Sequence, residues 1–168
     1  MTHSPILETR TLHWPDEEAC GRFASALAHT PALRNANIEL DGPLGAGKTT
    51  FVRHLLRALG VTGRIKSPTY AVVEPYSLSL GNGETLAVSH FDFYRFDDPR
   101  EWLDAGFREI YATPGLKLAE WASKAAPQLP TPDLVLILAP LADDTRQVRA
   151  QAFTPRGIEL LAATTEAA

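Results

Sequence analysis

The sequence predicts an α/β fold, a three-layer sandwich with a mixed, mostly parallel sheet and one antiparallel hairpin. The first observation is a glycine-rich loop at Gly42–Thr49 (GPLGAGKT), which lies between a short apolar strand and a helical pattern. The second is that strand patterns and helical patterns alternate along the chain, as in sheets covered by helices. The third is a pair of β-rich segments on either side of the turn Ser79–Glu84 (SLGNGE), a spacing that favours a hairpin.

The first sixty residues predict two strands and two helices. Strands are expected over Ile6–Leu12 and Asn37–Asp41. A helix is expected to start at Pro15–Glu17 and to end at Thr30-Pro31. After the glycine-rich loop, apolar residues recur at helical spacing up to Gly60, a suitable C-terminal cap; they are Phe51, Val52, Leu55, Leu56 and Leu59.

The middle of the chain predicts the hairpin and a further helix. Tyr70–Tyr76 and Thr85–Phe91 are rich in β-branched and aromatic residues and are expected to pair antiparallel. Asp98–Glu101 (DPRE) has the pattern of a helix start, with an N-cap, a proline at the first helical position and an acid that closes a capping box.

The C-terminal third predicts three strands and a last helix. Gly115–Ala119 is expected to be a short strand, and 126–133, with three prolines, a surface connection. Leu134–Ala139 (LVLILA) is a continuous apolar run, which suits a strand buried on both faces. Gln147–Phe153 predicts one more strand, and Thr154-Pro155 starts the helix.

Composition predicts an ordinary globular protein. At 168 residues, one domain is expected over 1–168, with a frayed tail at 162–168. A net charge of −4 and a pI of about 5.7 do not favour tight binding to nucleic acid through a strongly basic surface. The lone Cys20 excludes an intramolecular disulfide and is expected to pack as a small apolar residue. A cytoplasmic location is expected, because Met1–Leu12 lacks the apolar core of a secretory signal and no segment approaches the ~20 apolar residues of a membrane helix.

The glycine-rich loop fits the phosphate-binding pattern G-x-x-x-x-G-K-[ST] at every fixed position. Its glycines let successive N–H groups point at an anion, and the following helix adds its unpaired N–H groups and the positive end of its dipole. Lys48 is expected to reach the β- and γ-phosphates, and the Thr49 hydroxyl to bind Mg²⁺. The expected fold is therefore P-loop NTPase-like.

Phosphoryl transfer also needs an acid near Mg²⁺ and a group that positions the attacking oxygen. Asp92 and Glu120 each end a predicted strand, and ligands collect at the carboxyl ends of strands in open α/β sheets. Both are candidates to face the γ-phosphate, and a plain surface acid remains the alternative for each. His90 shares a sheet face with Asp92 and is expected to be a hydrogen-bonded structural residue. No H-x-x-x-H or C-x-x-C pattern predicts a zinc site.

Two further segments leave alternatives open. Ser67–Thr69 (SPT) follows the phosphate-loop helix, a place where such proteins often sense the γ-phosphate, but its spacing alone favours a plain turn, of which Ser-Pro is typical. A mildly basic stretch is interpreted first as a solvated helix face and second as a contact surface for RNA or an acidic partner; it comprises Arg53, His54, Arg57, Arg64 and Lys66.

Four strings together resemble the TsaE (YjeE) family of small bacterial ATPases. They are GPLGAGKTT at Gly42–Thr50, KSPTYAVVEPY at Lys66–Tyr76, HFDFYRFDDPREW at His90–Trp102 and AEW at Ala119–Trp121. The phosphate loop is shared by many proteins, whereas SPTY-x-x-VE-x-Y and HFD-x-YR are far more specific. One departure is Pro43, where the family usually has Asp; proline removes one N–H from the loop, and nucleotide binding is expected to survive.

The resemblance implies a P-loop ATPase that hydrolyses ATP with Mg²⁺ held by Thr49 and Glu120. It implies that Asp92 acts near the γ-phosphate, where it helps to place or activate water. The implied catalytic residues are therefore Asp92, Lys48 and Glu120, and Ser67, Pro68 and Thr69 form the implied nucleotide-sensing switch.

The resemblance also implies contacts around these groups. Trp121 is expected to pack beside the site, and Tyr94 and Arg95 to support it or to face a partner. Glu17 and Arg146 are expected to border the adenine. The remaining expected nucleotide contacts are Gly42, Pro43, Leu44, Gly45, Ala46, Gly47, Lys48, Thr49 and Thr50.

The family implies a cellular role in forming the threonylcarbamoyl modification on adenosine 37 of tRNAs that read ANN codons. The implied partners are the two other protein subunits of the bacterial threonylcarbamoyl transferase complex, TsaB and TsaD. ATP turnover is expected to reset that complex, with activity that depends on the partners, indirect contact with tRNA and no contact with a membrane.

Two other functions remain open. One is a small-molecule kinase with the same loop, although the connection between Arg95 and Leu116 leaves little room for a mobile lid. The other is a nucleotide-gated binding module that barely hydrolyses ATP. A GTPase is disfavoured, because no N-K-x-D segment is present to recognise guanine.

Overall fold

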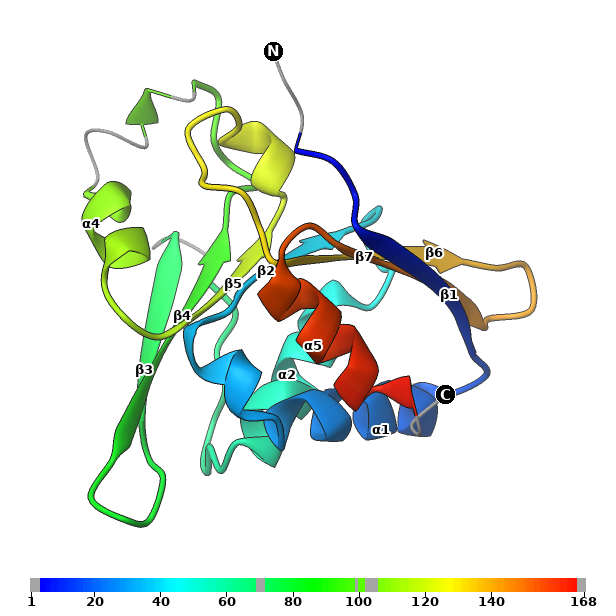
Figure 1. The fold of residues 1–168 in the computed structure, drawn as a ribbon. Helices are drawn as coiled ribbons and strands as arrows, with labels where there is room; N and C mark the ends of the chain where they lie inside the picture. The colour runs from blue at the N-terminus through cyan, green and yellow to red at the C-terminus, as the bar shows by residue number, and fades with distance from the viewer. Residues whose placement is uncertain (1–3, 69–71, 99, 102–105, 166–168) are drawn as a thin grey trace.

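The computed structural model describes residues 4–68, 72–98, 100–101 and 106–165, which form a seven-stranded mixed sheet with helices packed against it (Figure 1). The strand order is β1-β7-β6-β2-β5-β4-β3. The inner strands β6, β2, β5 and β4 run parallel, whereas β3 pairs antiparallel with β4, and β7 pairs antiparallel with both β6 and β1. The strands are β1 Glu8–Trp14, β2 Asn37–Asp41, β3 Val73–Ser79, β4 Thr85–Asp92, β5 Leu116–Glu120, β6 Leu134–Pro140 and β7 Arg146–Ala152. The predicted mixed sheet and its antiparallel hairpin are confirmed.

Helical elements lie on both faces of the sheet, and the two layers differ in thickness (Figure 1). One face carries α1 Glu17–Ala28, α2 Lys48–Ala58 and α5 Pro155–Ala163. The other carries the shorter α4 Phe107–Ala112 and the 3₁₀ turn η2 Ala122–Lys124, while η1 Pro31–Asn35 leads from α1 into β2. Within the described residues, no helix has the length and apolar character that crossing a bilayer requires.

The larger core lies between the sheet and α1, α2 and α5. Three aromatic rings form its centre below β1, where Phe23 lies 5.5 Å from Trp14 and 6.1 Å from Phe51, centroid to centroid. Phe23 and Phe51 are fully buried. Burying a side chain of this size contributes about 1.5–3 kcal/mol. This core fixes α2, and with it the phosphate loop, against the sheet.

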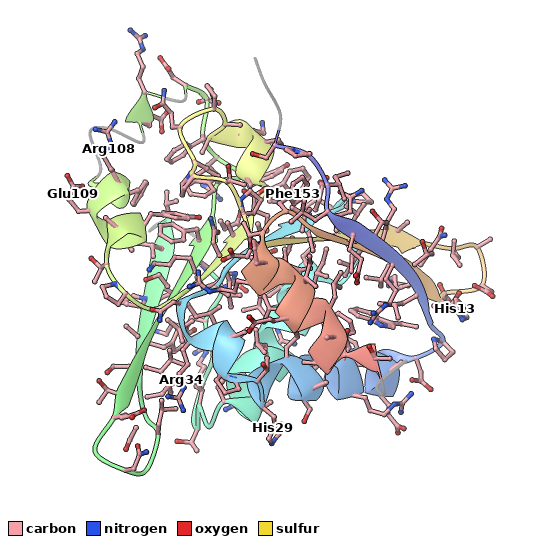
Figure 2. All side chains as sticks on the ribbon, in the orientation of Figure 1. His13, His29, Arg34, Arg108, Glu109 and Phe153 are labelled. Carbon is pink, nitrogen blue, oxygen red and sulfur yellow. The ribbon has the colours of Figure 1, made fainter. Side chains whose placement is uncertain are left out.

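A smaller aromatic core lies on the opposite face, at the carboxyl ends of β4 and β5. The rings of Phe91, Phe93, Phe96 and Phe107 pack at centroid distances of 5.1 to 6.1 Å. Phe107 points into this core from α4, whereas its neighbours Arg108 and Glu109 point away from it (Figure 2). The core therefore supports the two strand ends that carry the predicted acids.

The predicted helix starts at α1 and α5 are confirmed by their caps. The Asp16 carboxylate accepts a hydrogen bond from Ala19 N at 2.9 Å, which satisfies one unpaired N–H of the first turn. The Thr154 hydroxyl does the same for Gly157 N at 3.1 Å. Gly157 is required there, because a Cβ would lie 1.9 Å from the carbonyl oxygen of Asp133.

Two sequence predictions differ from the structure. β6 is not buried on both faces, since Leu134, Leu136 and Leu138 are buried whereas Val135 and Ile137 are partly exposed. β6 therefore has one face in the core and one face partly open to solvent. Residues 162–164 are not part of a frayed tail, because α5 extends to Ala163 and the buried Thr164 hydroxyl donates to Leu161 O at 2.8 Å.

Some predicted positions lie outside the described residues. They include Thr69 of the SPT segment and the first two residues of the predicted hairpin strand, 70–71, and the described strand β3 begins at Val73. The predicted helix start is described only in part: the Asp98 carboxylate accepts from Arg100 N at 2.9 Å, while Pro99 and residues 102–105 are outside the description.

Candidate functional site

The phosphate loop joins the carboxyl end of β2 to the first turn of α2. Gly42, Gly45 and Gly47 all adopt positive φ angles, of 145°, 82° and 105°. Residues other than glycine rarely adopt such φ angles, because their Cβ is disfavoured there. Gly42 is constrained further, because a Cβ would lie 2.5 Å from the carbonyl oxygen of Leu138 on β6. The glycines at the fixed positions therefore allow the loop to turn against the sheet.

The loop leaves several backbone donors free. Gly42 N donates to the Asp41 carboxylate at 2.8 Å, and Ala46 N donates to Pro43 O at 3.1 Å. The N–H groups of Leu44, Gly45 and Gly47 find no acceptor within the described part of the chain. With the helix N-terminus that follows, these donors suit an anion.

Lys48 lies at the centre of the site and is 5% exposed. Its ammonium donates to Gly42 O, and its nitrogen lies 3.8 Å from the centroid of the Trp121 ring. Burial lowers the pKa of Lys48, and the nearby carboxylates of Glu120, Asp41 and Asp92 oppose that shift. The Lys48 ammonium thus lies close to three carboxylates, at the start of the helix that follows the phosphate loop.

Glu120 ends β5, and its carboxylate is hydrogen-bonded to side chains of both α2 and β4. Its Oε1 accepts from the Thr49 hydroxyl at 3.0 Å, and its Oε2 lies 3.3 Å from the same hydroxyl. His90 Nε2 lies 2.7 Å from Oε2. Glu120 and His90 are both buried, at 2% and 1% exposure. A buried carboxylate needs such partners, because burial penalises its charge.

Asp92 ends β4 and is paired with Glu120 in the parallel β4–β5 register. Its Oδ1 accepts from Tyr94 N at 3.0 Å. Burial raises the pKa of Asp92, the Tyr94 N–H lowers it and the Glu120 charge raises it further. The predicted meeting of the two acids at one edge of the sheet is therefore observed.

Trp121 follows Glu120 in a left-handed conformation, with φ of 58°. This turn places its ring over Lys48 and 5.0 Å from the ring of Tyr94. Arg95 is exposed on the same connection. The family resemblance implied that Trp121 packs beside the site and that Tyr94 supports the site or faces a partner; the direct contact between these two rings was not predicted.

A cavity of about 260 Å³ lies beside the loop, between α1, the loop and β7. Arg146 forms one wall, with Nε donating to Ala46 O at 2.9 Å. Glu17 forms another and lies 3.0 Å from His54 Nε2. Burial raises the pKa of Cys20 to about 12, which suits a packed thiol. The lining residues are Trp14, Asp16, Glu17, Cys20, Ala46, Gly47, Thr50, Leu138, Asp144 and Arg146.

Comparison with known proteins identifies the chain. A family model described as "Threonylcarbamoyl adenosine biosynthesis protein TsaE" matches residues 14–148. The chain belongs to the TsaE family. It is 36% identical over 163 residues to the tRNA threonylcarbamoyladenosine biosynthesis protein TsaE of Haemophilus influenzae, covering 94% of this chain and 98% of that protein. It is 32% identical over 142 residues to the Bacillus subtilis protein of the same name, with 84% and 83% covered.

A solved structure agrees with this assignment. The crystal structure of Bacillus subtilis YdiB matches with a TM-score of 0.74 at 26% identity, covering 97% of this chain and 98% of that one. The predicted P-loop NTPase-like fold class is confirmed.

Most of the TsaE motifs converge on one edge of the sheet. The phosphate loop contacts the AEW string, since Thr49 bonds to Glu120 and Lys48 lies against Trp121. The HFD string lies beside them, because His90 bonds to Glu120 and Asp92 is paired with Glu120 in the strand register. Of the SPT string the structure describes Ser67, which is exposed, and Pro68, which is buried; no hydrogen bond or ion pair joins either to the loop in the described part of the chain. The switch role of this segment stays a prediction.

Two residues of the basic stretch have described partners, one on the neighbouring helix α1 and one just past the end of α2. His54 pairs with Glu17, and Arg57 donates to Val61 O at 3.1 Å. These contacts favour the interpretation as a helix face, and the RNA-contact interpretation stays untested.

The site offers oxygen donors that fit Mg²⁺. No cluster of three or more His, Cys, Asp or Glu side chains that could hold a metal was found among the described residues. The Thr49 hydroxyl and the Glu120 carboxylate are instead adjacent at the first turn of α2. Mg²⁺ is usually bound by one or two protein oxygens together with phosphate and water, so this small set suits it better than a complete protein cage would.

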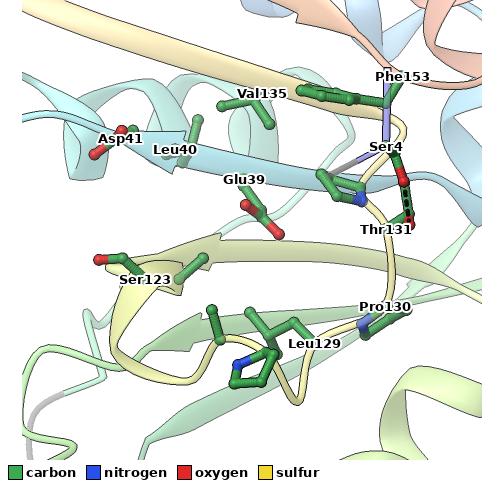
Figure 3. Close-up of a pocket in the computed structure, with 14 residues that line it drawn as sticks. Ser4, Glu39, Leu40, Asp41, Ser123, Leu129, Pro130, Thr131, Val135 and Phe153 are labelled. Atoms are coloured by element: carbon green, nitrogen blue, oxygen red, sulfur yellow. Dashed lines mark hydrogen bonds between the residues drawn. The ribbon is translucent and has the colours of Figure 1, made fainter. Parts of the chain in front are cut away.

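A second cavity of about 360 Å³ lies on the opposite face of β2, under the proline-rich connection (Figure 3). Glu39 points into it, and Ser4 and Thr131 close one side through a 3.1 Å hydrogen bond between their hydroxyls. Burial raises the pKa of Glu39 to about 7, and the Asp41 charge adds to the shift. No hydrogen bond to the Glu39 carboxylate was found within the described residues. The sequence did not indicate this half-buried acid, because Glu39 alternates with apolar residues as a surface residue would.

Proposed function

We propose that the chain is a single P-loop ATPase domain, residues 1–168, that binds and hydrolyses Mg-ATP in support of tRNA threonylcarbamoyladenosine formation. The observation that carries the proposal is the contact between Thr49 and Glu120, 3.0 Å apart, beside the buried Lys48. A hydroxyl, a carboxylate and a lysine at a phosphate loop are the groups that phosphoryl transfer requires. The names of the Haemophilus influenzae and Bacillus subtilis relatives support the pathway.

The phosphate chain is proposed to bind along the loop. The free N–H groups of Leu44, Gly45 and Gly47 are the donors, and Lys48 supplies the positive charge for the β- and γ-phosphates. Thr49 and Glu120 would hold Mg²⁺, which would neutralise the charge that develops on the phosphate oxygens. In this proposal the backbone donors of the loop bind the phosphates, and the first turn of α2 contributes Thr49 to the metal.

Asp92 is proposed to position the attacking water. Its carboxylate lies one strand away from Glu120 and is only half buried, so that solvent reaches it. The hydrogen bond from Tyr94 N fixes one oxygen and leaves the other available. A raised pKa brings a carboxylate closer to the range in which it can accept a proton from water.

The adenine is proposed to occupy the cavity of about 260 Å³ beside the loop. The cavity combines apolar surface from Trp14 and Leu138 with the carboxylate of Glu17 and the guanidinium of Arg146. Carboxylates accept hydrogen bonds only, so Glu17 suits the exocyclic amine of adenine. The choice of ATP over GTP rests on the family and on the absence of an N-K-x-D segment from the sequence.

The partners are proposed to be the other two subunits of the bacterial threonylcarbamoyl transferase, TsaB and TsaD. ATP turnover would reset that complex, Ser67–Thr69 would respond to the nucleotide, and contact with tRNA would be indirect. Leu44 in the loop and Tyr94 beside Trp121 are exposed apolar side chains at the mouth of the site, 69% and 45% exposed. Such side chains support docking of a protein there.

The test combines ATP binding and phosphate release, with and without the two partner subunits. Lys48→Ala should abolish binding or turnover, whereas Asp92→Ala and Glu120→Ala should bind ATP but lose partner-stimulated hydrolysis. If both acid variants hydrolyse ATP as fast as the parent, the catalytic assignment is wrong. A pull-down from the source bacterium should recover the two subunits, and their loss when ATP is withheld would show that docking depends on the nucleotide.

The same assay separates the alternatives. A nucleotide-gated binding module would bind ATP and the partners without releasing phosphate at any partner concentration. A kinase would transfer the γ-phosphate to a small acceptor, which a screen of phosphate acceptors with labelled ATP detects.

A further inference from the structure

His90 is a buried side chain that touches the proposed metal site without being one of its ligands. It lies on β4, two residues before Asp92, so both side chains project from the same face of the sheet. Its register partner on β5 is Leu118, and its ring reaches Glu120 two pairs further along the two strands. Only 1% of His90 is exposed. The sequence predicted a hydrogen-bonded structural histidine, and the structure identifies its partner as Glu120.

The hydrogen bonds around Glu120 divide its two oxygens between two partners. Oε1 takes the shorter bond from the Thr49 hydroxyl, 3.0 Å against 3.3 Å for Oε2. Oε2 takes the 2.7 Å contact with His90 Nε2. An ionised carboxylate only accepts hydrogen bonds, so Nε2 carries the hydrogen.

The second ring nitrogen agrees with this assignment. His90 Nδ1 is buried and has no hydrogen-bond partner in the described part of the chain. At this buried position a ring nitrogen without a hydrogen is tolerated better than an N–H group, because a buried N–H without an acceptor loses its hydrogen bond to water and gains none in return. A hydrogen on Nε2, donated to Glu120, therefore fits the contacts of both ring nitrogens.

We propose that His90 is a positioning residue that holds Oε2 of Glu120 and thereby presents Oε1, together with the Thr49 hydroxyl, to Mg²⁺. The inference rests on the proposed Mg-ATP function. Outer partners of metal-binding carboxylates fix the orientation of the carboxylate, and removing one typically weakens metal binding 10–100-fold. Without the ring, the Glu120 carboxylate is free to turn its other oxygen to Thr49.

The test measures Mg²⁺ binding apart from catalysis. His90→Phe keeps a planar ring and removes the donor, whereas His90→Gln keeps an N–H donor. His29→Gln is the control, because His29 is exposed and, within the described residues, its ring bonds to Ser25 O alone. Affinity for a fluorescent ATP analogue is measured over a range of Mg²⁺ concentrations and in EDTA.

We expect His90→Phe to need about 10–100-fold more Mg²⁺ for half-saturation, while analogue binding in EDTA stays within about twofold of the parent. His90→Gln should recover most of the loss, and His29→Gln should match the parent. If His90→Phe loses affinity for the analogue equally with and without Mg²⁺, or loses no affinity at all, the inference is overturned. A parent that shows no Mg²⁺ dependence would instead contradict the proposed function.

A second measurement needs neither nucleotide nor metal and decides the case if His90→Phe does not fold. Long-range ¹H–¹⁵N correlation on the ¹⁵N-labelled full chain in EDTA reports which ring nitrogen carries the hydrogen. We expect His90 to carry it on Nε2, with the ¹⁵N shift of Nδ1 that of a bare nitrogen. A hydrogen on Nδ1 alone would show that the ring does not donate to Glu120 and would overturn the inference.

Discussion

The Trp121 ring covers the Lys48 ammonium, whose nitrogen lies 3.8 Å from the ring centroid. Trp121 reaches this position because its backbone turns into the left-handed region directly after Glu120. A cation over an aromatic face is stabilised by about 0.5–2 kcal/mol, with the larger values for partly desolvated pairs. The ring thus helps to hold the lysine that is proposed to bind phosphate.

Trp121→Ala is therefore expected to weaken ATP binding by roughly 3–30-fold, the range that follows from that stabilisation. The ammonium would lose its aromatic cover and become hydrated. Trp121→Phe is the matched control, because it keeps an aromatic face at the same backbone position, and it should lose less than Trp121→Ala. Titration with a fluorescent ATP analogue measures both. Equal affinity in the parent and the alanine variant would show that the ring does not position Lys48.

Two glycines of the phosphate loop provide a matched pair for backbone geometry. Gly42→Ala would place a Cβ 2.5 Å from Leu138 O, so β2 and β6 must move apart there, whereas a Cβ at Gly45 meets nothing within 4 Å. We expect Gly42→Ala to lose roughly 2 kcal/mol or more of unfolding free energy, and Gly45→Ala about 1 kcal/mol from backbone strain alone. Urea denaturation measures the difference, and equal losses would contradict the close contact.

Glu39 predicts a dependence of stability on pH. Its pKa is raised from 4.5 to about 7 in the folded chain, so the folded state binds more protons than the unfolded state between these values. Stability from this group is therefore lost as pH rises from about 4.5 to about 7, by at most on the order of 3 kcal/mol. Glu39→Gln should raise the unfolding free energy at pH 8 and change it little at pH 4.

The control for this measurement is Glu159→Gln, which removes an exposed acid on α5. It should change stability by less than about 0.5 kcal/mol at both pH values. If Glu39→Gln is no more stable than the parent at pH 8, the carboxylate is not penalised by burial.

The aromatic core beneath the strand ends predicts a further difference. Phe107→Ala should cost about 3–5 kcal/mol of unfolding free energy, because Phe107 is buried against the rings of Phe91 and Phe96. Arg108→Ala, on the outward side of the same helix, should cost under about 0.5 kcal/mol. Thermal unfolding of the two variants compares them directly, and similar melting temperatures would show that α4 contributes little to the fold.

The order and approximate bounds of the helices and strands could be predicted because the sequence patterns that indicate them are local. The strand Asn37–Asp41 matches β2 residue for residue, and the acids Asp92 and Glu120 were brought together by the rule that ligands gather at the carboxyl ends of parallel strands. A cap, a proline position or an alternation of apolar residues is a property of a few neighbouring residues. Such properties survive in the sequence alone.

The burial of individual strands was harder to predict. β5 is buried along its whole length although it contains Lys117 and Glu120, whereas the purely apolar β6 is partly open. Lys117 is buried because its ammonium donates to the carbonyls of Thr113 and Gly115. These bonds depend on how the chain turns before β5, which residue types do not reveal.

The fine structure of the site depends on contacts between distant strands. The His90–Glu120 bond requires the β4–β5 register, and the Lys48–Trp121 contact requires the left-handed turn at Trp121. Leu138 and Asp144 border the cavity beside the loop because β6 and β7 lie next to β2 in the sheet order. No pattern within the sequence indicated these partners.

In the proposed function, the Thr49 hydroxyl and the Glu120 carboxylate together hold the metal of a bound triphosphate. Anomalous diffraction from crystals grown with Mn²⁺ and a non-hydrolysable ATP analogue locates the metal directly. We expect an anomalous peak at a coordination distance of about 2.0–2.2 Å from Thr49 Oγ1, with Glu120 bound to the metal or to one of its waters. A peak remote from both side chains, with the triphosphate ordered along the loop, would contradict it.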